Sequence, residues 1–405
     1  MATPGRRHLP LAAHARDVDR QHRPIYAVWE ITLACDLACR HCGSRAGRAR
    51  PDELTTAEAL DLVEQMADLG TLEVTLIGGE AYLRDDWLQI VRAIRRRGMD
   101  VTMTSGGRGL TEDVIARAAD AGLRGVSISI DGDEQTHDRL RGVVGSYRAA
   151  MQAIHAVRAR NLSAFCNTQI NRLSAPHLGG ILERIAELGV DSWQIQLTVP
   201  MGRAADEPEV LLQPYDLLSL FPALADLKRR CDELGVRLWP GNNIGYFGPF
   251  ESLLRGHRAY GPGGSCGAGR ATLGVEANGA IKGCPSLPTS AWTGGNIRDD
   301  KLVDIWERAE ALRYTRDRTT RDLWGFCQTC YYAEECMSGC TWTSFVGFGK
   351  PGNNPYCHHR ALEMQRAGKR ERVVAIDEAP GQPFDHGLFQ LVVEDLPPAT
   401  GESDD

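Results

Sequence analysis

Cysteines are the residues of this 405-residue chain best suited to chemistry, and most of its twelve fall into two groups. Three of them form a C-x3-C-x2-C array in ITLACDLACRHC: Cys35, Cys39 and Cys42. The last third of the chain holds the second group: Cys266, Cys284, Cys327, Cys330, Cys336, Cys340 and Cys357. The N-terminal residues do not form a secretion signal, and cytosolic thiols are kept reduced. We therefore expect a cytoplasmic protein whose cysteines bind metal.

The first array favours an iron-sulfur cluster. Three thiolates on one short loop can hold three irons of a cubane cluster and leave the fourth iron without a protein ligand. The alternative is a structural zinc site. Zinc prefers four closed ligands, however, and His41 is squeezed between two cysteines that are already in use. The array therefore predicts a [4Fe-4S] cluster with one open coordination position.

Repeated strand and helix patterns must position this array. Short β-rich runs alternate with amphipathic helical stretches, which is typical of βα units and a parallel sheet. The expected strands are 27–32, 73–77, 100–104, 125–130, 163–169 and 192–197. Six units are too few for a closed eight-fold barrel, so we expect an α/β protein with an open, partial (β/α)6 TIM-like barrel. Its functional face should lie at the C-terminal strand ends, where the first array begins.

Helix signals and apolar stripes indicate ordinary core. Thr55 and Glu58 form a possible capping box before the stripe that begins at Leu60. Cys166 falls within the fifth expected strand and Cys231 on an apolar helix, where a buried cysteine behaves as a small hydrophobe. We expect both cysteines in the core.

Composition and charge limit the class of protein. The net charge of −7 and the 42% of hydrophobic residues exclude a disordered chain and argue against a nucleic-acid partner. No apolar run approaches the roughly 20 residues of a membrane helix. We expect a flexible tail (1–24), the barrel (25–235), a linker (236–260), a Cys-rich domain (261–365) and a partly disordered C-terminal extension (366–405), in which only LFQLVVEDL could add a strand.

Polar residues and glycines follow several of the expected strands. The second expected strand leads into TLIGGEAYLR, and the third is followed by Ser105. The fourth unit contains SISIDG and HDRLRG. Alone, a Gly pair after a strand is usually a turn. The residues that we expect on the functional face are Gly78, Gly79, Glu80, Ser105, Ser129, Asp131 and Arg141.

In this order and at strand ends, these motifs resemble the radical S-adenosylmethionine superfamily over residues 25 to 235. The resemblance implies that Cys35, Cys39 and Cys42 bind a [4Fe-4S] cluster whose open iron chelates S-adenosylmethionine. It implies that Gly78, Gly79 and Glu80 hold the methionine amino group, and that Ser129, Asp131 and Arg141 contact the ribose or the carboxylate. An Arg suits a carboxylate because of its planar fork of donors. The alternative for Arg141 is a surface ion pair.

The late cysteines show the spacing C-x2-C-x5-C-x3-C from Cys327 to Cys340, flanked by Cys266, Cys284 and Cys357. This pattern resembles the SPASM extension of radical S-adenosylmethionine enzymes. The resemblance implies an outer cluster on Cys327, Cys330, Cys336 and Cys357, and an inner one on Cys266, Cys284 and Cys340. Two clusters need eight ligands, so the inner site has an open position, or Cys166 or Cys231 fills it. Zinc remains an alternative for the paired cysteines.

The resemblance implies three [4Fe-4S] clusters and the reductive cleavage of S-adenosylmethionine to a 5′-deoxyadenosyl radical that removes hydrogen from the substrate. Enzymes of this kind mostly modify peptides or proteins, and their substrates include ribosomally made precursor peptides. The resemblance therefore implies a precursor peptide as substrate, a flavodoxin- or ferredoxin-type electron donor and a possible separate peptide-recognition protein. Pro285 departs from the sulfatase-maturing pattern. The alternatives are haem or other cofactor biosynthesis and, from a different class, an iron-sulfur carrier or zinc-stabilised binding protein. No residue is singled out as a catalytic acid or base.

Overall fold

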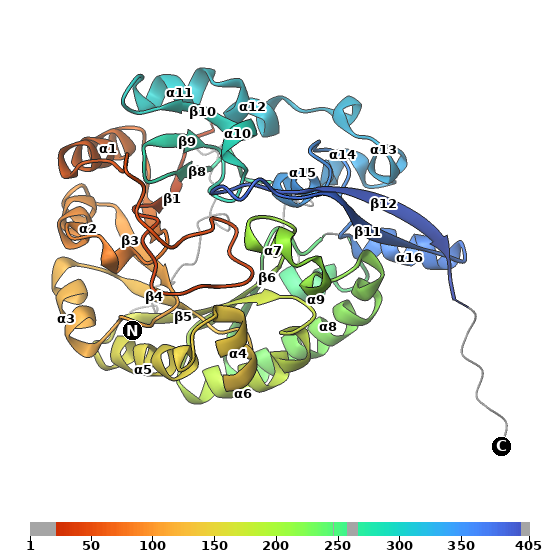
Figure 1. Ribbon diagram of the computed structural model, residues 1–405, viewed down its shortest axis with the longest axis horizontal. Helices are drawn as coiled ribbons and strands as arrows, with labels where there is room; N and C mark the ends of the chain where they lie inside the picture. The colour runs from red at the N-terminus through yellow and green to blue at the C-terminus, as the bar shows by residue number, and fades with distance from the viewer. Residues whose placement is uncertain (1–21, 246, 257–265, 398–405) are drawn as a thin grey trace, which may run out of the picture.

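Most of the chain folds around one ten-stranded sheet with the strand order β10-β9-β8-β1-β2-β3-β4-β5-β6-β7. The computed structural model describes residues 22–245, 247–256 and 266–397 (Figure 1). A separate two-stranded sheet lies near the C-terminus. The expected N-terminal tail therefore lies almost wholly outside the described residues.

Six parallel strands form the barrel-like part, and each has a helix on its outer side (Figure 1). All six expected strands are confirmed, with ends that match or differ by at most two residues. They are β1 (Tyr26–Glu30), β2 (Glu73–Ile77), β3 (Asp100–Ser105), β4 (Gly125–Ser129), β5 (Ser163–Ile170) and β6 (Ser192–Leu197). Most residues of these strands are buried, as is expected of parallel strands covered by helices.

The outer helices present their apolar stripes to the sheet. The capping box is confirmed, because the Thr55 side chain accepts a hydrogen bond from the Glu58 N–H, and the Glu58 side chain accepts one from the Thr55 N–H. Cys166 and Cys231 are both fully buried in the main hydrophobic core, as expected. The helices are α1 (Thr56–Asp68), α2 (Trp87–Arg96), α3 (Glu112–Ala121), α5 (Ser146–Ala159), α6 (Leu178–Glu187) and α8 (Leu217–Leu234). Two shorter helices follow strand ends: α4 (Glu134–Arg141) and α7 (Arg203–Asp206).

The sheet contains more than the six expected strands. Residues 236–260, expected as a linker, contain α9 (Glu251–Arg255) and β7 (Arg237–Pro240), which pairs parallel with β6. On the opposite side, β8 (Thr272–Val275) pairs parallel with β1, and β9 (Ala280–Lys282) and β10 (Thr293–Asn296) follow antiparallel. The Cys-rich region therefore extends the barrel sheet, and its strands satisfy the backbone groups that the β1 edge would otherwise expose.

The rest of the Cys-rich region is made of short helices joined by loops. The helices are α10 (Thr289–Trp292), α11 (Leu302–Arg308), α12 (Glu310–Asp317), α13 (Phe326–Thr329), α14 (Ala333–Cys336), α15 (Thr341–Val346) and α16 (His358–Arg366). None of these helices is longer than the nine residues of α16.

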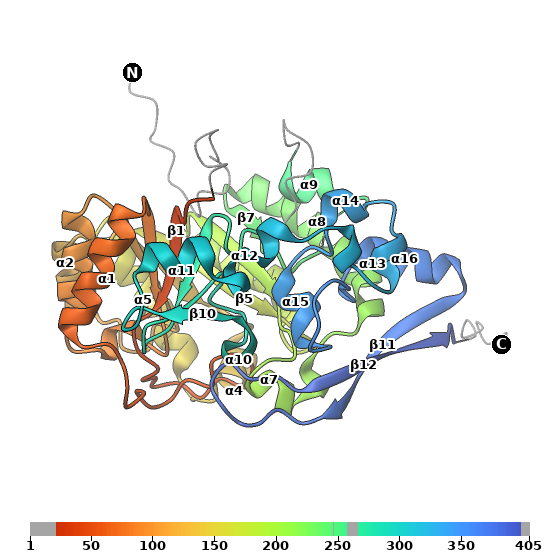
Figure 2. The ribbon, with the colours of Figure 1, turned by 90° about the horizontal axis from the view of Figure 1, so that it is seen from above.

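A β-hairpin follows α16. The expected strand in LFQLVVEDL is confirmed as β12 (Leu388–Asp395), and its partner β11 (Lys369–Asp377) was not foreseen. The expectation that only LFQLVVEDL could add a strand is therefore wrong. Residues 398–405, at the end of the extension, lie outside the described part, so the expected partial disorder stays a prediction. Figure 2 shows the hairpin as a long ribbon whose connecting loop returns toward α7 and α10. No helix of the described residues has the length and apolar character to cross a membrane.

Candidate functional site

The loop with Cys35, Cys39 and Cys42 follows β1 and crosses the C-terminal ends of the strands. Backbone bonds fix it: the Cys35 N–H donates to the Gly47 carbonyl at 3.1 Å, and the Ala38 N–H to the Arg141 carbonyl at 3.0 Å. Burial raises the pKa of Cys35 to about 12 and that of Cys39 to about 11. Burial alone thus disfavours the thiolates, and a cationic cluster would supply the charge that stabilises them, so the donor set fits a metal cluster.

Gly78 and Gly79 bring the end of β2 against this loop. A Cβ on Gly79 would lie 2.0 Å from the Ala34 carbonyl oxygen and 2.7 Å from the Cys35 Cβ, and one on Gly78 would lie 2.1 Å from the Thr32 oxygen. The Glu80 N–H donates to the Ala34 carbonyl at 2.7 Å. Only glycine permits this approach, so the Gly pair positions Glu80 beside the cysteine loop.

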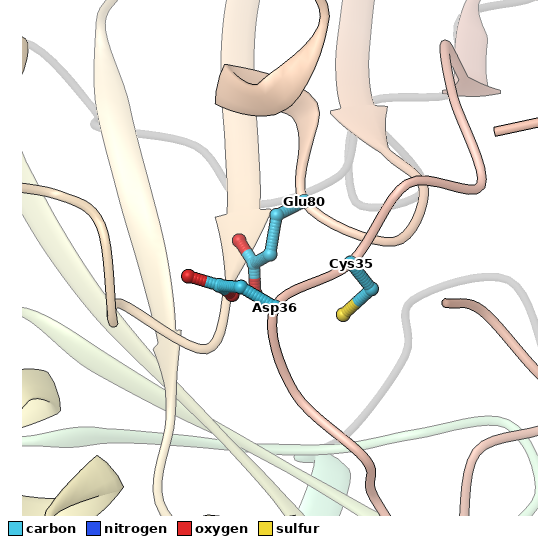
Figure 3. A group of neighbouring side chains, drawn as sticks. All are labelled: Cys35, Asp36 and Glu80. Atoms are coloured by element: carbon cyan, nitrogen blue, oxygen red, sulfur yellow. The ribbon is translucent and has the colours of Figure 1, made fainter. Parts of the chain in front are cut away.

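Glu80 and Ser105 are brought together from β2 and β3. The Ser105 hydroxyl donates to Glu80 Oε2 at 2.5 Å, and the Gly106 N–H donates to Oε1 at 2.7 Å. Figure 3 shows Glu80 beside Cys35 and Asp36, whose ligand atoms all lie within 4.8 Å of one another. Burial raises the pKa of Glu80 to about 7. A cationic amino group at this place would favour the ionised carboxylate, which suits the expected contact with methionine.

Asp131 and Arg141 form a buried ion pair behind the same loop. Arg141 Nη2 lies 2.5 Å from Asp131 Oδ2, and Arg141 Nη1 lies 3.6 Å from Cys39 Sγ. His41 Nε2 lies 3.4 Å from Asp131. Although burial opposes it, Arg141 and His41 hold the pKa of Asp131 well below its usual value. Arg141 Nε has no hydrogen-bond partner among the described residues, so one donor is available for a ligand.

Ser129 is buried at the last position of β4, with its backbone next to Asn167 of β5. It thus lies on the strand-end face with the other expected contact residues. Which of them bind S-adenosylmethionine stays a prediction.

The late cysteines separate into two groups in space. In one, Cys340 and Cys284 each have Cys266 as an electrostatic neighbour, and burial raises their pKa values to about 12 and about 11. In the other, Cys327 and Cys330 neighbour both Cys336 and Cys357. Burial is again the first cause of the raised pKa values. The two groups coincide with the expected inner and outer ligand sets, whose metal assignment stays a prediction.

A cavity of about 180 Å³ lies where the strand ends, the cysteine loop, the Cys-rich region and the C-terminal hairpin meet. It includes two residues of the expected site region, His41 and Gly78. Most of the other lining residues were not singled out from the sequence. The sequence contained a signal for Glu30, because an acid at the end of a buried strand indicates a polar site, but it contained no signal for Phe384. The lining residues are Glu30, His41, Gly43, Ser44, Ile77, Gly78, Gln169, Gln196, Thr198, Val199, Met201, Pro285, Ser286, Trp342 and Phe384.

Comparison with known proteins agrees with this architecture. Residues 29–171 match the family model described as Radical SAM superfamily, and residues 266–331 match SPASM, an iron-sulfur cluster-binding domain. The chain is 29% identical to an AdoMet-dependent heme synthase of Methanosarcina barkeri, over 83% of this chain and 97% of that protein. It is also 29% identical to the mycofactocin maturase MftC of Mycobacterium ulcerans, over 86% of this chain and 93% of that protein.

A solved structure has the same fold. Streptococcus suis SuiB bound to its precursor peptide SuiA superposes with a TM-score of 0.62 at 18% identity, covering 83% of this chain and 75% of SuiB. The chain carries a radical SAM domain over residues 29–171 and a SPASM domain over residues 266–331. It is a radical SAM/SPASM enzyme, and its two domains imply [4Fe-4S] clusters and S-adenosylmethionine.

Proposed function

We propose that this enzyme abstracts hydrogen from a ribosomally made precursor peptide and so introduces an oxidative crosslink or another post-translational modification. The relative named mycofactocin maturase supports this proposal, because it aligns with 86% of the chain. SuiB was solved with its precursor peptide SuiA bound, so a fold of this kind accommodates a peptide.

The observation that carries the proposal is the charge of the cavity. Its lining, within the described residues, contains one acid, Glu30, one histidine and no Lys or Arg. A tetrapyrrole presents several carboxylates, which proteins bind with Arg and Lys. An uncharged peptide segment instead matches the glutamines, hydroxyls and apolar side chains of this cavity.

Each residue of the site has a separate proposed role. We assign the open cluster to Cys35, Cys39 and Cys42, and the amino group of S-adenosylmethionine to Glu80 with its donors Ser105 and Gly106. The Arg141 fork is suited to the carboxylate, with Asp131 as its fixed counter-ion. When bound and reduced, the cluster supplies the electron that cleaves S-adenosylmethionine. The surrounding side chains then need only to hold the substrate and exclude water.

Two auxiliary clusters complete the proposed set of three. The outer one would be held by the group around Cys336 and the inner one by the group around Cys340. Their purpose would be to accept an electron when the product is more oxidised than the substrate. We further assign a flavodoxin- or ferredoxin-type electron donor, a separate peptide-recognition protein and a cytoplasmic location, where thiols stay reduced.

A second candidate function is haem or other cofactor biosynthesis. The relative named AdoMet-dependent heme synthase favours it, because 97% of that protein aligns with this chain. The two candidates differ in substrate chemistry and not in the radical step.

The experiment is a direct comparison of the two substrates. Anaerobically reconstituted protein is incubated with S-adenosylmethionine and dithionite. The substrate is either a short peptide encoded beside its gene or a carboxylated tetrapyrrole. The mass of each substrate is measured by mass spectrometry before and after the reaction. The proposal expects a mass change in a peptide and none in the tetrapyrrole. A mass change in the tetrapyrrole alone would replace the proposal with the second candidate.

A further inference from the structure

Glu30 is the only carboxylate among the described residues that line the cavity, and it is held there without a full set of partners. It ends β1 and is 1% exposed. Its Oε1 accepts only two long hydrogen bonds, from Arg50 Nη2 at 3.4 Å and from the Ala277 N–H at 3.3 Å. Its Oε2 has no hydrogen-bond partner among the described residues. A buried carboxylate oxygen without a partner is costly, so its retention calls for an explanation.

Structural ion pairing accounts for Oε1, which lies 3.4 Å from Arg50 Nη2, but not for Oε2, because the shorter contacts of the neighbouring cations go to another acid. Arg50 Nη2 lies 2.8 Å from Glu276 Oε2, and Lys282 Nζ lies 2.6 Å from Glu276 Oε1. Lys282 Nζ also donates to the Leu287 carbonyl at 2.6 Å. Glu276 therefore makes the short contacts to both cations, while the charge of Glu30 balances the group from a longer distance and its Oε2 keeps no partner.

The charges of this group indicate what kind of ligand Glu30 can take. Glu30, Glu276, Arg50 and Lys282 sum to zero when all are ionised. A charged ligand would leave an uncompensated charge in a buried place, whereas a neutral hydrogen-bond donor would not. The ring of Phe384 covers Lys282, with Nζ 3.9 Å from its centroid, and so separates this cation from the cavity.

Phe384 is held in this position by its neighbours. It adopts a φ of 57°, which is unfavourable for an aromatic residue and persists only where the surroundings fix it. The next residue, Asp385, accepts a hydrogen bond from Arg45 Nε at 2.7 Å and thereby ties the hairpin loop to the cysteine loop. Glu30 is thus a preformed acceptor in a cavity whose wall is fixed.

We propose that Glu30 is a substrate-binding residue whose free carboxylate oxygen accepts a hydrogen bond from a neutral N–H or O–H donor of the substrate. For the peptide proposed above, this donor is an amide N–H, and only that identification rests on the proposed function. In support, burial raises the pKa of Glu30 to about 7, and a donor bound to the ionised form would lower it again.

The test uses small probes and the reconstituted protein with its clusters. N-benzylacetamide carries one amide N–H, and N-benzyl-N-methylacetamide is the matched probe without it. Thermal unfolding midpoints are measured across a titration of each probe. At ten times the apparent Kd, N-benzylacetamide should raise the midpoint of the wild-type protein by about 2 °C, and the methylated probe should not.

Variants connect the effect to Glu30. Glu30→Met keeps the approximate volume but removes the acceptor, and it should weaken the binding of N-benzylacetamide by about tenfold. Glu30→Gln keeps an acceptor oxygen and should retain measurable binding. Glu73→Met is the matched control, because Glu73 is also a buried acid in a barrel strand. It begins β2, whereas Glu30 ends β1, and it does not line the cavity. This control should leave binding unchanged.

The proposal would be overturned if N-benzylacetamide did not stabilise the wild-type protein, or if the methylated probe stabilised it equally. Unchanged binding of N-benzylacetamide in Glu30→Met would also overturn it. So would tighter binding of benzylammonium than of N-benzylacetamide, which would indicate a cation site. Cleavage of S-adenosylmethionine is assayed separately on the wild-type protein. A failure there, or a substrate other than a peptide, would count against the proposed function and would leave the binding result standing.

Discussion

Arg141 connects Asp131 to the cysteine loop: its Nη2 lies 2.5 Å from Asp131 Oδ2, and its backbone carbonyl accepts the Ala38 N–H at 3.0 Å. Both side chains are buried, Asp131 completely. One residue therefore holds the loop through its backbone and an acid through its side chain. The position of the three cysteines depends on this buried pair.

Removing Asp131 should destabilise the protein strongly. Asp131→Ala leaves the Arg141 cation buried without its partner, for which we expect a loss of about 3–5 kcal/mol in the free energy of unfolding. Urea denaturation of the anaerobic protein measures it. Asp113→Ala is the control, because Asp113 pairs with Arg117 on the exposed face of α3 and should lose at most about 1 kcal/mol. Similar losses in the two variants would contradict the structural role of the pair.

The hairpin loop should open when Asp385 is removed. Asp385 Oδ1 pairs with Arg45, and its Oδ2 accepts the Gly381 and Gln382 N–H groups at 2.5 and 2.8 Å. Asp385→Ala should increase the rate of proteolysis within residues 378–387 by about tenfold, since charge-assisted hydrogen bonds contribute about 1.5–3 kcal/mol each.

Asp206→Ala is the matched control for this loop. Asp206 also pairs with Arg45, at 2.6 Å, but lies outside the hairpin. We expect its cleavage rate to stay close to that of the wild-type protein. If both variants were cleaved equally fast, Arg45 and not Asp385 would be the group that fixes the loop.

Stability should depend on pH through Glu30. Burial raises its pKa from an ordinary 4.5 to about 7, so the folded protein binds more protons than the unfolded chain between these values, and this contribution to stability falls as the pH rises through that window. Glu30→Gln removes the effect. The variant should be more stable than the wild-type protein at pH 8, and the difference should be smaller at pH 6.

Urea denaturation at the two pH values measures this difference. The groups that face Glu30 are Arg50, Glu276 and Lys282, and Glu276, whose pKa is lowered by Lys282 against the effect of burial, stays ionised across the window. A variant less stable than the wild-type protein at both pH values would mean that Glu30 is a structural ion-pair partner.

Iron content should respond separately to the two late cysteine groups. We expect about twelve irons per chain in the wild-type protein, and about eight after Cys336→Ala or Cys340→Ala, because each change removes a ligand of a different [4Fe-4S] cluster. Electron paramagnetic resonance should show that different signals are lost. Cys231→Ala, in the core, should keep all twelve. Loss of the same signal in both variants would contradict the two ligand sets.

The six barrel strands could be predicted because buried parallel strands are short apolar runs between helices with clear stripes and caps. The cysteine arrays could be recognised from their spacing, whereas the role of Glu80 was expected from the resemblance to the radical S-adenosylmethionine family, since a Gly pair after a strand is alone usually a turn. Ser105 came next to Glu80 because strand ends of one parallel sheet meet at one edge. These are local signals, and each can be found in a few consecutive residues.

The remaining features depend on long-range pairing. β8 has only four residues, and it is held in place by pairing with β1. The paired residues Tyr26 and Thr272 are 246 positions apart in the sequence. The charges in KRERVVAID conceal β11, which pairs on one side with β12. Phe384 enters the cavity because Asp385 reaches Arg45 in the cysteine loop, a contact across 340 positions that no local pattern encodes.

The central claim is that the loop after β1 holds a cluster that cleaves S-adenosylmethionine. The most direct test is anaerobic formation of 5′-deoxyadenosine from S-adenosylmethionine and dithionite by the reconstituted protein. We expect the wild-type protein and Cys231→Ala to form the nucleoside, and the replacement of Cys35, Cys39 and Cys42 by Ala to abolish its formation. No nucleoside from the wild-type protein, or zinc in place of iron, would contradict the account.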